Sequence, residues 1–189
     1  MSAGLAAARS NMVESQVRVA DVTDYAIQDA MRAAPRESLL PPDKAYAAYA
    51  DAAVEYAPGR WLLSPRDVGK LLQAVRPRAG ERALAICAPY AAMVMEAMGV
   101  AVTRLDDGDL KSPGGAYDVI VCEGAVSSVP PGWTAALSPG GRLGVVVAKG
   151  VVGRAMLYLH SPTGVGGRDV FDCAQPILPG FEAAAGFAF

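Results

Sequence analysis

Short apolar runs alternate with helix-like stretches over the second half of the chain. Three such runs, 82–87, 100–105 and 117–122, are each bounded by polar residues or glycine, which is typical of strands. The last of them is apolar on both faces, as a parallel strand covered on both sides should be. Between the first two runs, residues 90–98 predict a short helix that Gly99 ends. Alternating strands and helices predict an α/β protein with a doubly wound, mostly parallel sheet.

Further strands are expected in the C-terminal part of the chain. Residues 142–148 follow the turn 139–141 and predict one more buried strand. Residues 154–160 and 169–174 predict two strands joined by the glycine-rich turn 163–167. Because a short turn joins them, we expect an antiparallel hairpin at the edge of the sheet.

The first third of the chain has helical patterning instead. Residues 11–19 place apolar side chains among polar ones, and Thr23 or Asp24 can cap a second helix that Pro35 ends. The alanine-rich stretch 43–54 predicts a third helix. These elements together predict an N-terminal helical layer.

Length and composition favour one compact unit. The chain has 189 residues, of which 52% are apolar and 19% charged, a balance that argues against disorder. We therefore expect residues 1–60 to form the helical layer and residues 61–189 to form the α/β domain, packed together.

Charge and hydropathy argue against several classes of partner. The formal net charge is -2 and the arginines are scattered, so no basic face is expected for nucleic acid or an anionic membrane. The nearly uncharged stretch 83–102 is interrupted by Pro89 and Gly99, which argues against a membrane span. The N-terminus has no apolar run behind a basic start, so we expect no signal peptide and predict a cytoplasmic protein.

The cysteines point to a reducing compartment. Cys87, Cys122 and Cys173 lie far apart inside apolar stretches. Their odd number and the lack of a CxxC pair predict buried free thiols. With His160 as the only histidine, a metal site is not expected.

A ligand of such a sheet binds at the carboxyl ends of its parallel strands. Cys87 ends the first predicted strand at that edge, and Asp106 and Glu123 directly follow the next two. The turn after the first strand reads Cys87-Ala88-Pro89, although glycines normally let the backbone approach a nucleotide-like ligand here. Side chains and a proline of fixed φ therefore stand where a bare backbone is expected.

Ser64 begins a strong helix-start pattern. Serine is a preferred cap, Pro65 takes the first helical position, and Asp67 falls where a capping box places an acid. Val68 and the apolar residues up to Val75 then predict one apolar face of a helix. The cap explains Ser64 fully, and contact with a substrate carboxylate is the alternative role.

Six segments, spread over almost the whole chain, together match the pattern of one known family. They are residues 11–18, 29–36, 62–65, 116–121, 137–143 and 171–182. In their order and spacing they resemble the protein-L-isoaspartate O-methyltransferase family, the last segment resembling its bacterial branch. The resemblance implies a Rossmann-like methyltransferase fold, which agrees with the predicted sheet.

The resemblance also implies an activity and ligand contacts. The family transfers a methyl group from S-adenosylmethionine to isoaspartyl residues, so isoaspartyl-containing proteins or peptides would be the partners. Because a sulfonium is already a strong electrophile, the protein mainly aligns the reacting groups. The implied cofactor contacts are Cys87, Ala88 and Tyr90 at the junction and Asp106 as the ribose acid. Glu123 joins them as a second acid at the same edge.

The chain departs from the family pattern at three places. Residues 87–89 replace a glycine-rich loop and are shorter than it. The family's serine position holds Leu63, so Ser64, the candidate catalytic residue, lies one place away. A helix and a strand normally follow the ribose acid, but residues 106–115 predict only a loop, so this unit is expected to be missing. An alternative alignment places Asp107 at a later acid of the family.

Two functions follow from these features. The first is S-adenosylmethionine-dependent protein carboxyl methylation, weak or lost because the cofactor loop departs from the pattern. The second is a non-catalytic interaction protein, a pseudoenzyme that keeps the fold and binds a protein partner or a second copy of itself. Loss of an outer helix and strand would expose a new sheet edge, and an open edge invites pairing. A nicotinamide-dependent Rossmann protein fits poorly, because it needs glycines in the same turn.

Overall fold

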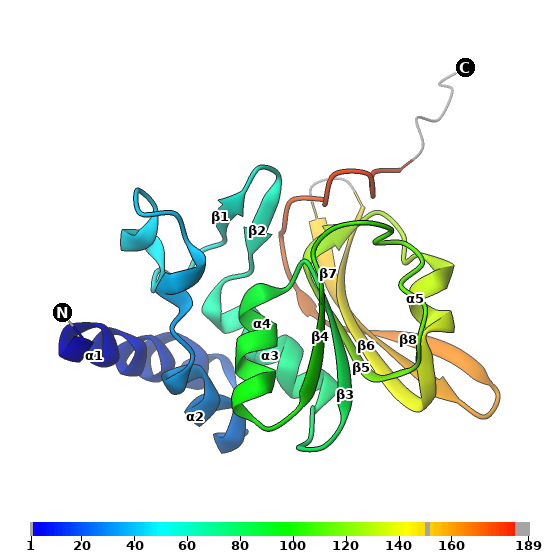
Figure 1. The fold of residues 1–189 in the computed structure, drawn as a ribbon, viewed down its shortest axis with the longest axis horizontal. Coiled ribbons are helices and arrows are strands. Elements are labelled where there is room, and N and C mark those ends of the chain that lie inside the picture. The colour runs from blue at the N-terminus through cyan, green and yellow to red at the C-terminus, as the bar shows by residue number, and fades with distance from the viewer. Residues whose placement is uncertain (1, 150–151, 184–189) are drawn as a thin grey trace.

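A six-stranded sheet with helices on both faces forms the centre of the molecule (Figure 1). The computed structural model describes residues 2–149 and 152–183. The strand order is β4-β3-β5-β6-β7-β8. The bounds are Arg82–Ile86 (β3), Ala101–Leu105 (β4), Tyr117–Val126 (β5), Leu137–Lys149 (β6), Val152–Ser161 (β7) and Gly164–Asp172 (β8). A separate hairpin pairs β1 (Val54–Ala57) with β2 (Arg60–Leu62).

The four strands β4, β3, β5 and β6 are parallel. β3 pairs with β4 on one side and with β5 on the other, and β5 pairs with β6. The register places Ile86 of β3 beside Leu105 and Cys122, so the three strands reach the same edge of the sheet. The predicted doubly wound, mostly parallel sheet is confirmed.

β4 is an edge strand, and the chain passes from it directly to β5. Residues 106–116 form neither helix nor strand, which agrees with the loop predicted over residues 106–115. Leu110 in this connection packs against the sheet, and its carbonyl accepts a hydrogen bond from the Trp133 indole at 2.6 Å. A loop therefore covers part of the face that a helix covers in most parallel crossovers.

The other half of the sheet is an antiparallel meander. β6 pairs with β7 and β7 pairs with β8. The predicted C-terminal hairpin is confirmed, but its bounds differ: β7 is longer than 154–160, and β8 begins at Gly164, inside the predicted turn 163–167, and ends two residues before 174. β8 forms the far edge of the sheet.

The helices include a longer N-terminal segment than the pattern of residues 11–19 predicted. The α-helices of the described residues are α1 (Ser2–Met12), α2 (Tyr25–Ala33), α3 (Pro65–Val75), α4 (Pro89–Ala97) and α5 (Pro131–Ala135). A π-helical turn (Val13–Val17) and a 3-10 turn (Arg18–Ala20) continue α1, and further 3-10 turns lie at Arg36–Leu39 and Ala45–Ala47.

Two helices begin at the caps that the sequence predicted. Asp24 accepts hydrogen bonds from the amides of Ala26 and Ile27 at 2.9 and 3.3 Å, so Asp24 rather than Thr23 caps α2. The Ser64 hydroxyl accepts a hydrogen bond from the amide three residues later at 3.2 Å and caps α3. Both caps satisfy amides that have no partner inside their helix.

The helix predicted over residues 43–54 is wrong. Only a 3-10 turn, Ala45–Ala47, forms there, and Val54 already belongs to β1. The Ala48 carbonyl accepts a hydrogen bond from the buried Arg36 guanidinium at 2.9 Å, so the backbone serves a tertiary contact instead of a helix. Helix propensity is a weak preference, and tertiary contacts overrode it here.

Two hydrophobic cores pack against opposite faces of the sheet. Ala83 and Ala85 of β3 belong to the core that α1 to α4 cover. Leu84 and Ile86 alternate with them and face the second core, which contains Trp133 of α5. Figure 1 shows the same division, with α2, α3 and α4 on one side of the sheet and α5 on the other.

The N-terminal helical layer packs closely on α3. A Cβ atom added at Gly69 of α3 would lie 3.0 Å from Val17 and 3.2 Å from Val22. Met31 of α2 is completely buried in the same core. The expected division of the chain at residue 60 falls inside the β1–β2 hairpin.

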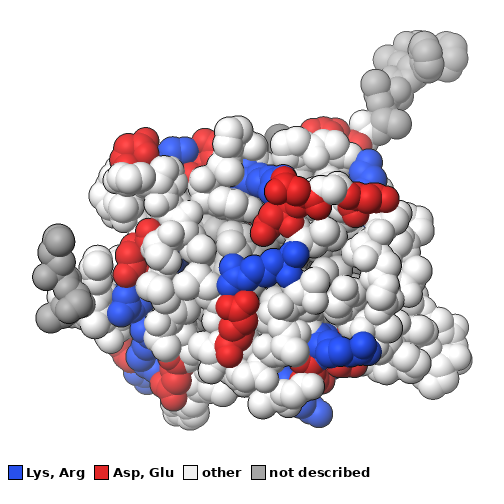
Figure 2. Space-filling view, viewed as in Figure 1, with Lys and Arg blue, Asp and Glu red and all other residues white. Residues whose placement is uncertain are grey.

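The surface carries charges of both signs. Figure 2 shows acidic and basic side chains next to one another on this face, with no broad region of one sign. Arg104 of β4, for example, pairs with Glu96 of α4 at 2.7 Å. No helix among the described residues is long and apolar enough to span a membrane.

Candidate functional site

The junction between β3 and α4 lies where the central parallel strands end. Cys87 and Ala88 connect strand and helix, and Pro89 is the first helical residue. Cys87 has a φ of 44°, in the left-handed region that glycine normally occupies. Its amide donates a hydrogen bond to the Leu105 carbonyl at 3.1 Å, which ties the turn to the end of β4. The turn keeps a glycine-like backbone but carries a side chain.

Side chains bury this junction. Ile86, Cys87, Ala88 and Tyr90 are each at most 1% exposed. Burial raises the pKa of the Cys87 thiol to about 11, against the opposing effect of the nearby Arg60 charge. Cys87 is therefore a neutral packing group at physiological pH, not a nucleophile.

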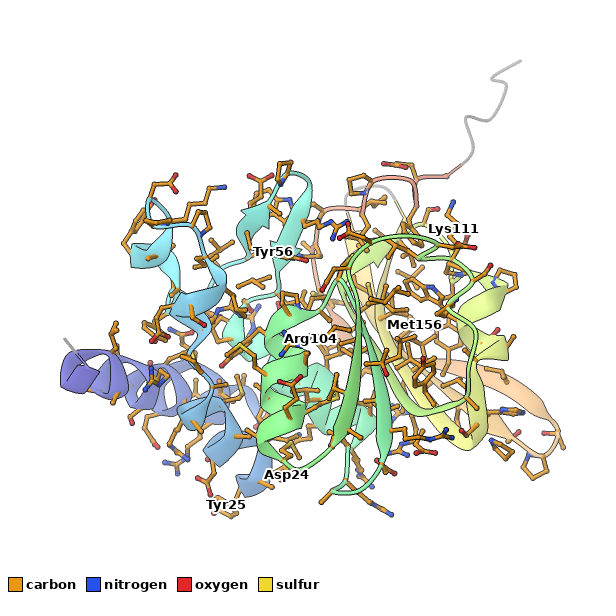
Figure 3. All side chains as sticks on the ribbon, in the orientation of Figure 1. Asp24, Tyr25, Tyr56, Arg104, Lys111 and Met156 are labelled. Atoms are coloured by element: carbon orange, nitrogen blue, oxygen red, sulfur yellow. The ribbon has the colours of Figure 1, made fainter. Side chains whose placement is uncertain are left out.

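The β1–β2 hairpin lies against the outer side of the junction. Figure 3 shows Tyr56 of β1 between the hairpin and α4. Burial raises the pKa of its hydroxyl, and the nearby Cys87 and Glu123 raise it further. Arg60 of β2 pairs with Asp107, beyond the end of β4, at 3.1 Å. The hairpin thus connects the helical layer to the strand ends.

Glu123 is the acid at the centre of the site. It lies in β5, just beyond the last residue that pairs with β3, and is completely buried. One carboxylate oxygen accepts a hydrogen bond from the Ala91 amide at 2.6 Å, and the other accepts one from the Leu63 amide at 3.2 Å. Glu123 therefore caps the N-terminus of α4 from a neighbouring strand.

Two of the backbone donors in the first turn of α4 are already used within the chain. Pro89 has no N–H, and the Ala91 amide donates to Glu123. The Ala92 amide donates to the N-cap carbonyl at 2.9 Å. The Ala91 and Ala92 amides, two of the N–H groups that bind anions at helix N-termini, are thus satisfied within the chain.

Glu123 has an altered acidity because of its surroundings. Burial, the largest cause, raises the pKa of Glu123 to about 7, while the Arg36 charge and the backbone amides lower it. Arg36 is also completely buried, and burial lowers its pKa while the charge of Glu123 raises it. The two desolvated groups therefore stabilise each other's charged forms.

Arg36 connects the helical layer to the site. Its Nε donates to the Ala48 carbonyl at 2.9 Å and its Nη2 donates to the Leu63 carbonyl at 2.6 Å. Its guanidinium stacks on the Tyr90 ring, 4.7 Å from the ring centre. Because the Leu63 amide donates to Glu123 and the Leu63 carbonyl accepts from Arg36, one residue contacts both buried charges through its backbone.

The structure places Ser64 beside this cluster but gives it a structural contact. Ser64 is 5% exposed, and its hydroxyl accepts the amide hydrogen of Asp67. It directly follows Leu63, whose amide and carbonyl contact Glu123 and Arg36. A role for Ser64 at a substrate carboxylate stays a prediction.

The predicted cofactor residues do lie together in the fold. Cys87, Ala88 and Tyr90 form the junction, and Glu123 contacts an amide of the helix that follows. Asp106 ends the neighbouring β4, is half-buried, and lies close enough to Cys87 to raise its pKa. Their roles toward a cofactor stay predictions.

Sequence reasoning missed Arg36 and Tyr56. Arg36 follows the proline that ends α2, and an arginine in a short polar stretch gives no signal of burial. The one available signal was its position between Pro35 and the apolar Leu39–Leu40, inside a segment that carries the family resemblance. Tyr56 was not assigned because the hairpin that holds it was not predicted.

The described residues do not fit the methionine part of S-adenosylmethionine at this junction. That part needs an approachable backbone and free donors, but Cys87 fills the turn and Glu123 takes the Ala91 amide of α4. Asp106 is the exception, because a half-buried acid at the end of β4 fits the ribose position. The candidate site thus keeps an acid at the expected ribose position, Asp106, but lacks the open turn expected next to the methionine part.

The parallel order β4-β3-β5-β6 and the antiparallel meander beyond it define a Rossmann-like methyltransferase fold. Solved structures share it. A putative protein-L-isoaspartate O-methyltransferase from Plasmodium falciparum, in complex with S-adenosyl-L-homocysteine, matches with a TM-score of 0.71 and 14% identity, over 90% of this chain and 97% of that chain. A second protein-L-isoaspartate O-methyltransferase structure matches with a TM-score of 0.68 and 21% identity, over 83% of this chain and 62% of that chain.

Sequence comparison confirms the resemblance to that family. The protein-L-isoaspartate O-methyltransferase of Methylorubrum extorquens (strain PA1) is 38% identical over 103 residues, which are 53% of this chain and 45% of that protein. That of Methylorubrum populi is 34% identical over 102 residues, 53% of this chain and 48% of that protein. The chain is thus a homologue of these proteins and spans about half their length. No protein-family model matches it.

Proposed function

We propose that this chain is a methyltransferase of the protein-L-isoaspartate type, with S-adenosylmethionine as its cofactor, whose methyl transfer is weak or lost. The homology and the shared fold support the methyltransferase type. A similar structure in complex with S-adenosyl-L-homocysteine supports the cofactor. Isoaspartyl-containing proteins or peptides would be the substrates, and repair of aged proteins would be the role of an active form.

One observation supports weak activity above all. The Glu123 carboxylate accepts the Ala91 amide hydrogen in the first turn of α4, where this fold normally receives a ligand. Loss of that position lowers affinity for the methyl donor, because binding and alignment are the main tasks of such a protein. Asp106 remains available, so residual binding through the ribose is expected.

Cytoplasmic localisation is part of the same proposal. Cys87, Cys122 and Cys173 are all free and buried. Free thiols of this kind are typical of proteins in a reducing compartment. The mixed surface charge supports a protein or peptide substrate more than nucleic acid.

Calorimetric titration with S-adenosylhomocysteine tests this function. We expect little or no heat of binding for this chain, and slow or undetectable methylation of an isoaspartyl peptide with labelled S-adenosylmethionine. The Methylorubrum extorquens relative, assayed in parallel, is the positive control. Low-micromolar affinity together with rapid methylation would contradict the proposal of weak activity.

A second function is favoured by the open edge of β4. Among the described residues β4 pairs only with β3, which leaves its other edge unpaired. The Ala101 amide and the Leu105 carbonyl both bond toward β3, so the backbone groups of Val102 face outward. A non-catalytic protein could use this edge to pair with a second copy or another chain.

Light scattering after size exclusion tests this second function. Pairing through β4 predicts a mass above the 19.5 kDa of one chain. Val102→Pro should return the protein to a monomer, because proline removes the outward N–H, whereas Val102→Thr keeps it and should not. A wild-type monomer that methylates the peptide supports the enzyme instead.

A further inference from the structure

A side chain of the protein itself holds the position where this fold would hold the anionic part of a ligand. Glu123 lies at the carboxyl edge of the sheet, between the end of β3 and the N-terminus of α4. Ligands of open α/β sheets bind at this edge, and their anionic groups face a helix N-terminus. The position is therefore occupied from within the chain.

The contacts of Glu123 are those of a bound carboxylate. Its Oε1 accepts the Ala91 amide hydrogen at 2.6 Å, and its Oε2 accepts that of Leu63 at 3.2 Å. Both oxygens are thus held by backbone donors from two different segments, as a small-molecule carboxylate would be.

A buried cation completes the surroundings. Arg36, itself completely buried, donates to the carbonyl of Leu63, the residue whose amide contacts Glu123. Arg36 Nη1 has no hydrogen-bond partner among the described residues. The partial positive charge of the helix N-terminus and this guanidinium both favour an anion in the place of Glu123.

A packing role alone does not explain an acid here. The neighbours Cys122 and Ala125 on β5 are apolar and completely buried. A buried carboxylate costs free energy unless donors surround it. An apolar residue at position 123 would avoid that cost but would leave the amides of Leu63 and Ala91 without an acceptor.

We propose that Glu123 is a built-in anion that substitutes for the anionic group of a ligand at the N-terminus of α4, and that removal of its carboxylate opens a binding position for small carboxylates. The inference rests on the proposed function, because it explains why the cofactor position is closed. Beyond the proposed function, it names the Glu123 carboxylate as the group that closes the cofactor position. It also names small carboxylates as the ligands that the opened position would accept.

Chemical rescue of Glu123→Ala tests the proposal. This substitution removes the atoms that acetate contains, so acetate is the matched probe. The variant should have a lower Tm than the wild type, and acetate should raise the Tm by about 3–6 °C at ten times its dissociation constant. Acetamide has the same shape without the charge and should give a much smaller rise.

Wild type and Glu123→Gln are the controls. In both, a side chain fills the position, so acetate should leave their Tm unchanged when sodium chloride holds the ionic strength constant. An equal effect of acetate on all three proteins would overturn the proposal, and so would a folded Glu123→Ala variant that acetate does not stabilise.

A measurement on the wild type keeps the proposal testable if Glu123→Ala does not fold. In proton–nitrogen correlation spectra, the Ala91 amide proton should shift downfield as Glu123 ionises and should lose this titration in Glu123→Gln. An Ala91 amide that does not respond to pH or to the substitution would overturn the proposal. These readouts use no cofactor.

The two proposals fail in different ways. Tight binding of S-adenosylhomocysteine by the wild type contradicts the closed cofactor position and the weak activity, whatever acetate does. Failure of acetate rescue, with no cofactor binding by the wild type, removes only the assignment of Glu123 as the substitute anion.

Discussion

At the scale of single residues, Glu123 should make stability depend on pH. Burial raises its pKa in the folded protein to about 7, above its ordinary value of 4.5. The folded protein therefore binds the proton of the Glu123 carboxyl more tightly than the unfolded chain does. Protonation of Glu123 thus stabilises the fold; this contribution is complete below about pH 4.5 and is lost as the pH rises to about 7. The loss should be about 3 kcal/mol in the free energy of unfolding.

Urea unfolding between pH 5 and pH 8 measures this dependence. Glu123→Gln should flatten the profile in that range, because the amide does not titrate. Carboxylates with lowered pKa, such as Glu81 beside Arg142, have the opposite effect on stability: they destabilise the protein when they are protonated, and they do so at lower pH. A flat wild-type profile, or a profile that Glu123→Gln leaves unchanged, would show that Glu123 is not the cause of the pH dependence.

The three cysteines should be unreactive in the folded protein. Burial is the main cause that raises the pKa of each thiol, and for Cys87 the value is about 11. We expect a thiol reagent at pH 8 to label native protein slowly and to label all three cysteines after unfolding in guanidinium. Rapid labelling of Cys87 in the native state would show that the β3–α4 junction is accessible.

At the scale of elements, Ser64 should matter to α3 in the way that a cap does. Ser64→Ala removes the acceptor for the Asp67 amide and should lower the free energy of unfolding by about 1 kcal/mol. Ser64→Asp retains a capping oxygen, so it should lower the free energy of unfolding by less than Ser64→Ala does. Chemical denaturation measures both. If activity is detectable, a drop in Ser64→Asp beyond the loss of folded protein would favour the substrate-contact role instead.

Elements with strong local signals were predictable from the sequence. The run Ser64-Pro65 with Asp67 fixed the start of α3, and apolar runs located β3, β4 and β5. Residues 43–54 were not predictable, because their alanine content favours a helix and the competing contact with Arg36 involves a distant segment.

The candidate site was predictable in its location but not in its internal contacts. The ends of β3, β4 and β5 had to meet once the sheet was parallel, so Cys87, Asp106 and Glu123 were expected near one another. The burial of Arg36 and the orientation of Glu123 toward α4 depend on how the helical layer packs, and no local pattern encodes that.

At the scale of the whole molecule, the helical layer and the sheet should unfold together. Val17 and Val22 touch Gly69 of α3, and Arg36 reaches the carbonyl of Leu63. Calorimetry should therefore show a single transition for the full chain. Residues 61–189 alone should lack a cooperative transition, because the covered face of α3 would be exposed. Two separate transitions would mean that the layer is an independent domain.

The direct passage from β4 to β5 has a consequence for how the protein folds. β3, β4 and β5 all lie within residues 82–126, so the middle of the sheet is encoded by one short stretch of chain. Closing a shorter loop costs less entropy, and contacts between residues close in sequence form faster. We expect these strands to come together early, before the meander β6–β8 completes the sheet, so the shortened connection would favour rapid nucleation.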